Sequence, residues 1–225
     1  MAVKAEKYPE PQFLPPVASG YIYLGLSVAP PRVPPVHHSA ERDKEIERCL
    51  TLADRLTALP EVVRARVFQA VLIPPLKGLP RFDVTMLVET ASPGDIEHVR
   101  ASGPFKEIDA KLVMPADNPV RLGDTENPAT GTYLFNHFLA PDSDAAVEGW
   151  KSVAGWYTAN TGVDNSIPLR PLGESPYAMV NYARIPGKAA PFLVRQLTRP
   201  SFHRFVRPRL KEHGMTALPL LVRPM

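Results

Sequence analysis

GTYLFNHFLA at residues 131–140 resembles GYIYLGLSVA at residues 20–29, and this pair of stretches decides the fold. Both are rich in aromatic and β-branched residues, which favour strands. Each runs into a proline and then into a helical pattern. We therefore predict that the two stretches open equivalent units and that the chain carries an internal duplication.

The first stretch is followed by the pattern of a βαββαβ unit. Apolar residues recur at three- and four-residue steps after Ser39, the predicted N-cap, and Pro60 ends this helix. A second, short and broken helix is predicted from Ser92. The remaining strands of this unit are predicted at 63–73, 81–91 and 111–116.

The second stretch is followed by the same order of elements. A helix is predicted after Asp142, with Val147, Trp150 and Val153 on its apolar stripe and Gly162 as its C-cap. A further helix, broken at its prolines, should precede the last strand. The remaining strands are predicted at 166–173, 177–185 and 216–224.

This order predicts an α+β protein in which two tandem βαββαβ ferredoxin-like units form one intrachain α/β barrel. The polar, turn-forming segment between the units reads as a linker. The predicted divisions are a proline-rich N-terminal arm at 1–19, a first unit at 20–117, a linker at 118–130 and a second unit at 131–225.

The amino-acid composition limits the classes of protein to which the chain can belong. The chain has 225 residues, 44% of them hydrophobic, which is enough for a sizeable core. Its 27 prolines must punctuate many short elements, and its single cysteine, Cys49, allows no intrachain disulfide. The N-terminal residues lack the apolar run of a signal peptide, and no window approaches the roughly 18 apolar residues of a spanning helix. We therefore expect a cytoplasmic protein without membrane association, and a homodimer is compatible with the sequence.

The tandem element order resembles the dimeric α/β-barrel superfamily of ferredoxin-like folds, over about residues 20–225. Antibiotic-biosynthesis monooxygenases, polyketide cyclases, EthD-like proteins and the haem-containing chlorite dismutases are members. The resemblance implies a ligand cavity within the barrel or between a sheet and its helices. It rests on element order and on no diagnostic motif, so it informs fold more than function.

The stretch at 131–140 offers one polar side chain on each face of its strand. Asn136 lies on one face and His137 on the other, each among bulky apolar residues. A buried polar atom without a partner costs about 1–3 kcal/mol, so each should be paired or should bind a ligand. His137 is a candidate base, haem ligand or oxygen-orienting donor. The alternative is a histidine tied to a backbone carbonyl.

Four further residues are candidates for the same cavity. Tyr182 and Arg184 share one face of the strand at 177–185. Asn181 falls on the opposite face of this strand. A set of asparagine, tyrosine, arginine and tryptophan around an apolar cavity would suit an oxygenase or isomerase that orients an enolate or phenolate. Trp150 and Trp156 lie on nearly opposite faces of one helix, so one should be core and the other should line a pocket or interface; the alternative is that both only pack.

Other reactive side chains, histidines and one cysteine, lie elsewhere in the sequence. His203 is a second haem candidate, because some haem-binding members of the superfamily use a histidine on this helix. The adjacent His37 and His38 have no partners at metal-ligand spacing, so we predict no metal site there. Cys49 lies on an apolar stripe and reads as a buried structural thiol. The sequence holds no nucleophile elbow, P-loop, dinucleotide-binding or zinc-protease motif.

The C-terminal quarter is strongly basic. From Arg184 to Arg223 it carries nine lysines and arginines against one acid, although the whole chain has a net charge of only +3. We predict that arginines here, Arg204 and Arg207 among them, attract an anionic substrate group; the alternative is a solvated helix face. Nucleic acid is disfavoured because Phe202 and Phe205 have core spacing rather than that of an exposed stacking platform.

These observations favour a small-molecule enzyme over other classes. We predict a cofactor-independent oxygenase, cyclase or isomerase of biosynthesis, acting on a hydrophobic or aromatic and in part anionic metabolite held in a barrel cavity. Its catalytic residues would be His137, Asn136 and Tyr182, and its ligand-binding residues Arg184, Trp150, Trp156 and Arg204. One alternative is a haem-dependent enzyme or haem-binding protein that uses His137 or His203. The other is a non-catalytic ligand-binding protein.

Overall fold

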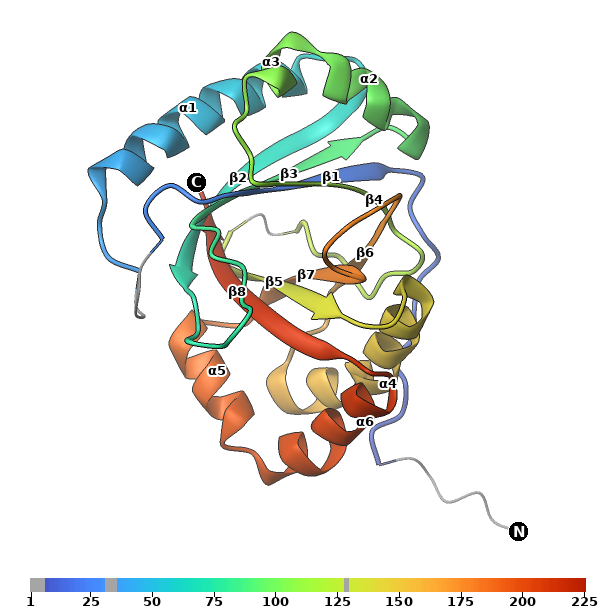
Figure 1. Ribbon diagram of the computed structural model, residues 1–225. Helices are drawn as coiled ribbons and strands as arrows, with labels where there is room; N and C mark the ends of the chain where they lie inside the picture. The colour runs from blue at the N-terminus through green and yellow to red at the C-terminus, as the bar shows by residue number, and fades with distance from the viewer. Residues whose placement is uncertain (1–6, 31–35, 128–129) are drawn as a thin grey trace.

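Eight antiparallel strands close into a single barrel in the computed structural model, which describes residues 7–30, 36–127 and 130–225 (Figure 1). Neighbouring strands follow the order β1-β3-β2-β8-β5-β7-β6-β4, and β4 returns to β1. The strands are β1 (Gly20–Leu26), β2 (Val62–Leu72), β3 (Val84–Thr90), β4 (Leu112–Asp117), β5 (Thr132–Leu139), β6 (Ile167–Pro171), β7 (Met179–Ile185) and β8 (Thr216–Pro224).

Each half of the barrel is one βαββαβ unit. The first unit has the order β4-β1-β3-β2 and the second the order β8-β5-β7-β6, so the two halves have equivalent topology. They join where β2 pairs with β8 and where β4 pairs with β6. This confirms the predicted tandem ferredoxin-like barrel. Because the barrel closes within one chain, no second copy is needed to complete it, and the homodimer stays a prediction.

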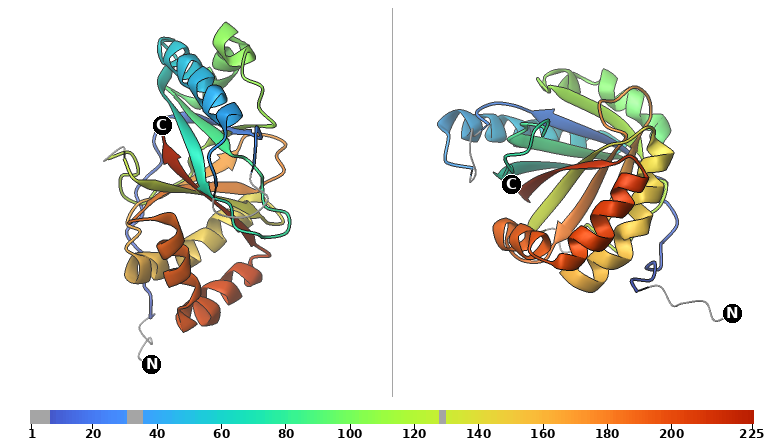
Figure 2. Two further views of the ribbon diagram at one scale, coloured as in Figure 1. Left: turned by 90° about the vertical axis from the view of Figure 1, so that its left-hand side faces the viewer. Right: turned by 60° about the horizontal axis from the view of Figure 1, so that its bottom comes forward.

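The helices of the two units lie on opposite sides of the barrel (Figure 2). The first unit carries α1 (Ala40–Thr57), a 3₁₀ turn at Pro93–Asp95, α2 (Ile96–Ala101) and α3 (Gly103–Lys106). The second carries α4 (Ser143–Thr161), α5 (Ala189–Leu197) and α6 (Arg207–Glu212). None of the helices within the described ranges is both long and apolar enough to cross a membrane.

Local chemistry explains where the two longest helices begin and end. Ser39 Oγ accepts the backbone N–H of Arg42 at 3.3 Å and starts α1. The Asp142 side chain accepts the N–H of Ala145 at 2.7 Å and starts α4 in the same way. Gly162 ends α4 with a φ of +74°, a left-handed conformation that costs glycine little. The predicted caps Ser39 and Gly162 are therefore present, and the cap at Asp142 is an addition from the structure.

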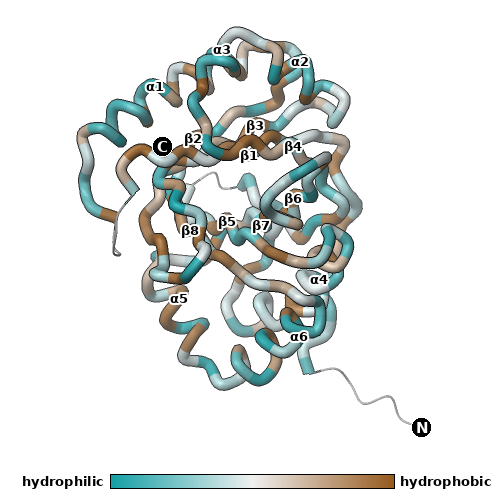
Figure 3. The backbone as a smooth tube through the Cα atoms, viewed as in Figure 1, coloured by the Kyte–Doolittle hydropathy of each residue, from teal (hydrophilic) through white to brown (hydrophobic). Residues whose placement is uncertain are grey.

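The strands bury both of their faces. One set of side chains fills the barrel interior, and the opposite set packs beneath the helices of each unit. Consequently β1 and β3 are hydrophobic along most of their length, whereas hydrophilic residues are concentrated in the helices and loops (Figure 3). The chain thus has three apolar layers, and the middle one is the barrel.

The connection between α5 and α6 is irregular. A π turn at Phe202–Val206 runs directly into α6, where a proline with no N–H occupies the first turn. The sequence predicts a helix broken at Pro200 and Pro208. The helix is interrupted at residues 198–199, just before Pro200, but it is not broken at Pro208, because the π turn continues directly into α6. The sequence does not predict the π turn.

The N-terminal arm packs along the second unit from residue 7 onward, and residues 1–6 of the predicted arm lie outside the described ranges (Figure 1). Leu14 and Arg121 exchange backbone hydrogen bonds of 2.8 and 3.2 Å. The Phe13 ring lies 5.3 Å from the ring of Trp150 on α4. A Cβ on Gly155 would come within 2.1 Å of the Pro9 carbonyl oxygen, so glycine permits this close approach.

Candidate functional site

The barrel interior is packed with aromatic side chains. The Tyr182 ring stacks on Phe135 at 5.0 Å and on Tyr133 at 5.4 Å, and all three side chains are fully buried. Phe68 meets the same stack edge-on. Rings that alternate inward on adjacent strands fill this part of the interior, and a substrate cavity inside the barrel stays a prediction.

A charged network closes one end of the barrel. Arg66 donates to the Tyr182 hydroxyl oxygen at 2.9 Å and pairs with Glu126 at 2.6 Å. Burial raises the pKa of Tyr182 well above its ordinary value, so its hydroxyl stays protonated. Arg184 donates to the carbonyl of Asn127 at 2.9 Å in the predicted linker. Tyr182 and Arg184 therefore belong to this network and do not share a cavity with Asn136.

His137 points into the barrel, four residues along β5 from Tyr133, and is fully buried. Its Nδ1 lies 3.2 Å from the Leu218 carbonyl oxygen, and its Nε2 lies 3.0 Å from the Tyr23 hydroxyl. A carbonyl only accepts, so Nδ1 carries the hydrogen and Nε2 accepts from Tyr23. Burial lowers the pKa of His137 to about 4 and keeps it neutral. This environment favours a structural role, and catalysis or haem ligation by His137 stays a prediction.

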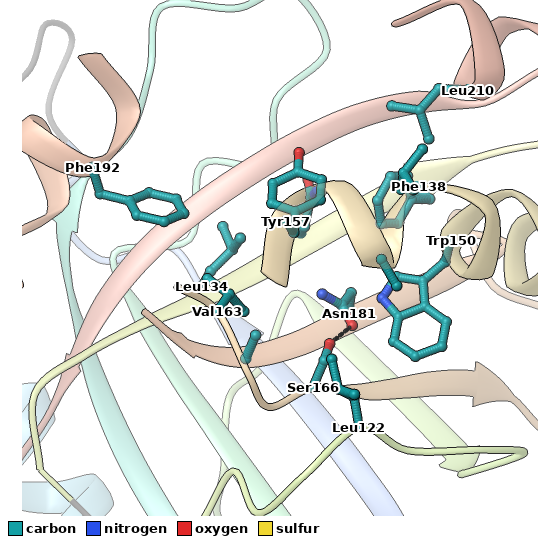
Figure 4. Close-up of a pocket in the computed structure, with 14 residues that line it drawn as sticks. Leu122, Leu134, Phe138, Trp150, Tyr157, Val163, Ser166, Asn181, Phe192 and Leu210 are labelled. Carbon is teal, nitrogen blue, oxygen red and sulfur yellow. Dashed lines mark hydrogen bonds between the residues drawn. The ribbon is translucent and has the colours of Figure 1, made fainter. Parts of the chain in front are cut away.

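A cavity lies on the opposite face of the same strands, between β5, β7 and the helices of the second unit (Figure 4). The centre of a water-sized sphere can occupy about 40 Å³ of it. The lining is largely apolar: Leu122, Leu134, Asn136, Phe138, Trp150, Val153, Ala154, Tyr157, Val163, Ser166, Asn181, Ala183, Phe192 and Leu210.

Two asparagines face each other in this cavity. Asn136 of β5 and Asn181 of β7 are directly paired across the sheet, and each is only 8% exposed. The Asn136 Oδ1 has no hydrogen-bond partner among the described residues. Ser166 Oγ donates to Asn181 Oδ1, which leaves the Asn181 amide nitrogen on the cavity side (Figure 4). The cavity therefore offers one acceptor and one donor in apolar surroundings.

Helix α4 contributes two aromatic groups to the same cavity. Tyr157 accepts a hydrogen bond of 3.1 Å from Gln196 Nε2, so its own O–H remains a donor. Burial raises the pKa of Tyr157, which keeps that proton in place at neutral pH. Trp150 closes one end of the cavity and is held from outside by Phe13 of the N-terminal arm. The arm thus fixes a wall of the cavity.

The other predicted residues lie elsewhere. Trp156 is fully buried, donates from Nε1 to Ser201 Oγ at 3.0 Å, and packs outside the cavity lining. His203 is exposed and its Nε2 lies 2.7 Å from the Leu197 carbonyl oxygen. Arg204 is exposed and also outside the lining. Of the predicted site residues, the cavity brings together Asn136 and Trp150.

Sequence reasoning missed three residues of the cavity as site members: Tyr157, Ser166 and Asn181. The strand periodicity holds a signal for one of them, because Asn181 takes the same helix-facing alternation on β7 that Asn136 takes on β5. Tyr157 reads as part of the apolar stripe of α4. Ser166 contacts Asn181 only through tertiary structure, so no local pattern marks it.

Metal ligands are scarce in this part of the molecule. Across the described ranges, no group of three or more histidine, cysteine, aspartate or glutamate side chains gathers at metal-binding distance. The cavity lining contains no histidine, cysteine, methionine or carboxylate. The residues present are hydrogen-bonding and aromatic groups rather than ligands for iron.

Solved structures with the same architecture cover nearly the whole chain. An anthrone oxidase-like protein superposes with a TM-score of 0.62 at 12% identity, over 92% of this chain and 91% of its own. A protein described as a monooxygenase from Fusobacterium nucleatum gives 0.52 at 8% identity, over 91% of each chain. A chlorite dismutase variant from Candidatus Nitrospira defluvii gives 0.50 at 7% identity, over 92% of this chain and 90% of its own.

The chain has the dimeric α/β-barrel fold. No protein-family model and no curated protein sequence matches it, so this statement rests on structure. At sequence identities this low, structural similarity establishes the fold and says nothing about the reaction or the ligand. The expected resemblance to this superfamily is confirmed at the level of the fold.

Proposed function

We propose that the protein is an enzyme that oxidises a flat aromatic phenol or enol with molecular oxygen and without a cofactor, in the cavity of the second unit. The observation that carries the proposal is the Asn136 Oδ1, which is buried without a partner and faces an otherwise apolar space. Leaving such an atom unpaired costs about 1–3 kcal/mol. A ligand hydroxyl that donates to it would recover that free energy.

The polar groups of the cavity complement an aromatic ring that carries oxygen atoms. Asn136 would accept from a phenol or enol O–H, and the Asn181 amide and Tyr157 hydroxyl would donate to a neighbouring oxygen. Donors fixed in a site without water stabilise a developing oxyanion more than water does. Trp150 and the apolar lining would hold the ring. The arrangement thus favours formation of the substrate anion.

The name of the anthrone oxidase-like neighbour suggests a concrete reaction. In anthrone oxidation one methylene carbon loses two hydrogens and gains one oxygen atom of O₂, and the second oxygen atom leaves as water. All electrons come from the substrate, so no reductant is required. The cavity lining has no side chain that titrates near neutrality, so the substrate proton would leave to solvent while the protein stabilises the anion.

The haem alternative fits these residues poorly. The cavity lining has no histidine, and the Tyr157 hydroxyl is held by Gln196. His137 has both ring nitrogens engaged inside the barrel, and His203 bonds a backbone carbonyl at the surface. Purified protein supplied with hemin should show no sharp Soret band beyond that of free hemin; a stoichiometric band lost in His137→Gln or His203→Gln would favour the alternative.

The proposed reaction can be tested with dithranol, a stable anthrone. We expect the protein to accelerate oxygen uptake and quinone formation over the spontaneous rate, and Asn136→Leu to lose at least about tenfold of that acceleration. Gly103→Ala, a change in the first unit where a Cβ meets open space, serves as a fold control and should leave the acceleration unchanged. Dithranol that binds without accelerated oxygen uptake would instead support the non-catalytic ligand-binding alternative.

A further inference from the structure

An open groove runs along the outer side of α6, next to the cavity. The centre of a water-sized sphere can occupy about 800 Å³ of it. Its walls come from the π turn, from α6 and from the start of β8, and they include Phe202, His203, Arg207, Leu210 and Lys211. This groove is far larger than the open part of the neighbouring cavity.

The groove is positively charged. His203, Arg207 and Lys211 follow one another at four-residue steps, and all three line the groove. The lining contains no carboxylate. Within the described ranges Arg207 and Lys211 form neither an ion pair nor a side-chain hydrogen bond, so both charged groups face solvent. An anion that entered the groove would meet unpaired guanidinium and ammonium donors.

The groove and the cavity share a wall. Leu210 lines both spaces and is 9% exposed. Phe202, on the groove side, packs in the same apolar cluster as Leu210 and Trp150. A ligand that extends past Leu210 would therefore have one part in the cavity and the other in the groove.

The backbone around this wall departs from regular α-helix. Pro200 and Pro208 have no N–H to complete helical hydrogen bonds, and the π turn lies between them. π turns are wider than α-helical turns and are frequent at functional sites. A shift of this segment would move Leu210, which separates the two spaces.

We propose that the groove binds the anionic end, a carboxylate, sulfonate or phosphate, of the same molecule whose aromatic part occupies the cavity. This inference rests on the proposed function, because it assigns the substrate a second, charged part. Arg207 can pair two oxygens with its planar guanidinium, and Lys211 adds a second positive charge one turn further. Arg204 lies outside the groove lining and contributes no contact.

Two fluorescent dyes test this inference. Anilinonaphthalene sulfonate and phenylnaphthylamine share the same aromatic groups and differ by one sulfonate. We expect the wild-type protein to bind the sulfonate more tightly, and Arg207→Gln and Lys211→Gln each to weaken it about two- to fivefold while phenylnaphthylamine is unaffected. Arg204→Gln, an equal loss of charge nearby, should change neither. The preference for the sulfonate should shrink in about 1 M NaCl, where charges are screened within about 3 Å.

A variant that fills the cavity separates this inference from the proposed function. Ala154→Leu, or Ala183→Leu if the first does not fold, should weaken both dyes because each alanine lines the cavity. If both dyes ignore a folded cavity variant, the proposed site is wrong. If both dyes respond to it, but Arg207→Gln and Lys211→Gln weaken the sulfonate no more than Arg204→Gln, the groove inference alone is overturned. Equal weakening of both dyes by Arg207→Gln would also overturn it.

Discussion

The two units share one topology but differ at a pair of facing positions beneath their helices. In the first unit Leu24 of β1 pairs with Met86 of β3 beneath the helices, and both are fully buried. The equivalent pair in the second unit is Asn136 with Asn181. The first unit therefore has a continuous apolar layer here, whereas the second has two amides facing a cavity.

The barrel-facing positions next to this pair differ as well. Gly25 of β1 occupies the place that His137 takes in β5, and a Cβ on Gly25 would come within 2.5 Å of the Phe82 ring. His137 instead fills its position and bonds Tyr23 across the barrel. Gly25 leaves room for the Phe82 ring, and the His137 ring fills the equivalent space in the second unit. Both residues therefore serve the packing of one barrel core.

The contrast locates function in the second unit. Both units supply side chains to the barrel core, which must be filled for the fold to form. The layer under α4, α5 and α6 combines buried polar atoms with open space. The comparison predicts that a buried asparagine is tolerated beneath the helices of the second unit and not beneath those of the first.

The largest effect should come from placing an amide in the first unit. Leu24→Asn leaves a polar group among apolar residues and removes packing, so we expect a loss of about 4 kcal/mol in the free energy of unfolding. Urea unfolding measures it. Leu24→Met is the matched control and should cost less than about 1.5 kcal/mol. A loss below about 1 kcal/mol for Leu24→Asn would mean that this layer is as permissive as that of the second unit.

The next effect concerns the pH dependence that His137 imposes on stability. Its pKa is about 4 in the folded protein against an ordinary value of 6.5, so the unfolded chain takes up a proton that the folded chain does not. This contribution to stability is complete above pH 6.5 and declines as the pH falls towards 4, by about 3 kcal/mol in all. His137→Gln should flatten the decline, as urea unfolding at several pH values would reveal. Parallel pH profiles for the two proteins would rule out the assigned neutral histidine.

A smaller effect should follow from detaching the N-terminal arm. The methyl group of Gly155→Ala would collide with the Pro9 carbonyl, so we expect a loss of about 1–2 kcal/mol and faster proteolysis before residue 19. Gly103→Ala is the control, because a Cβ there meets open space. Thermal unfolding and limited proteolysis report both properties. An arm as protected as in wild type would show that the contact with α4 is not tight.

Sequence patterns predicted the barrel because its signals are local. Strand composition, the caps Ser39 and Asp142, and the terminator Gly162 fix where elements begin and end, and repetition of their order gives the topology. The alternation of side chains along β5 also predicted that Asn136 and His137 point to opposite faces of the strand. It could not tell which face looks into the barrel, because both faces of β5 are buried and aromatic.

The cavity was harder to predict because it depends on distant contacts. Asn181 is positioned by Ser166 across the sheet, and Tyr157 by Gln196 of α5. The sequence predicted that Tyr182 and Arg184 lie near Asn136. In the structure Tyr182 contacts Arg66 and Glu126 at the end of the barrel, and Arg184 donates to the carbonyl of Asn127. Pairings over such separations leave no periodic trace in a single sequence.

The central claim is that the asparagine pair makes the second unit a site. Asn136→Leu combined with Asn181→Met gives the second unit the residues of the first. We expect this double variant to have about the wild-type free energy of unfolding, because removing the unpaired Asn136 acceptor offsets the loss of the hydrogen bond from Ser166 to Asn181. Oxygen uptake with dithranol should fall to the spontaneous rate. A double variant that oxidises dithranol as fast as the wild type would contradict the account.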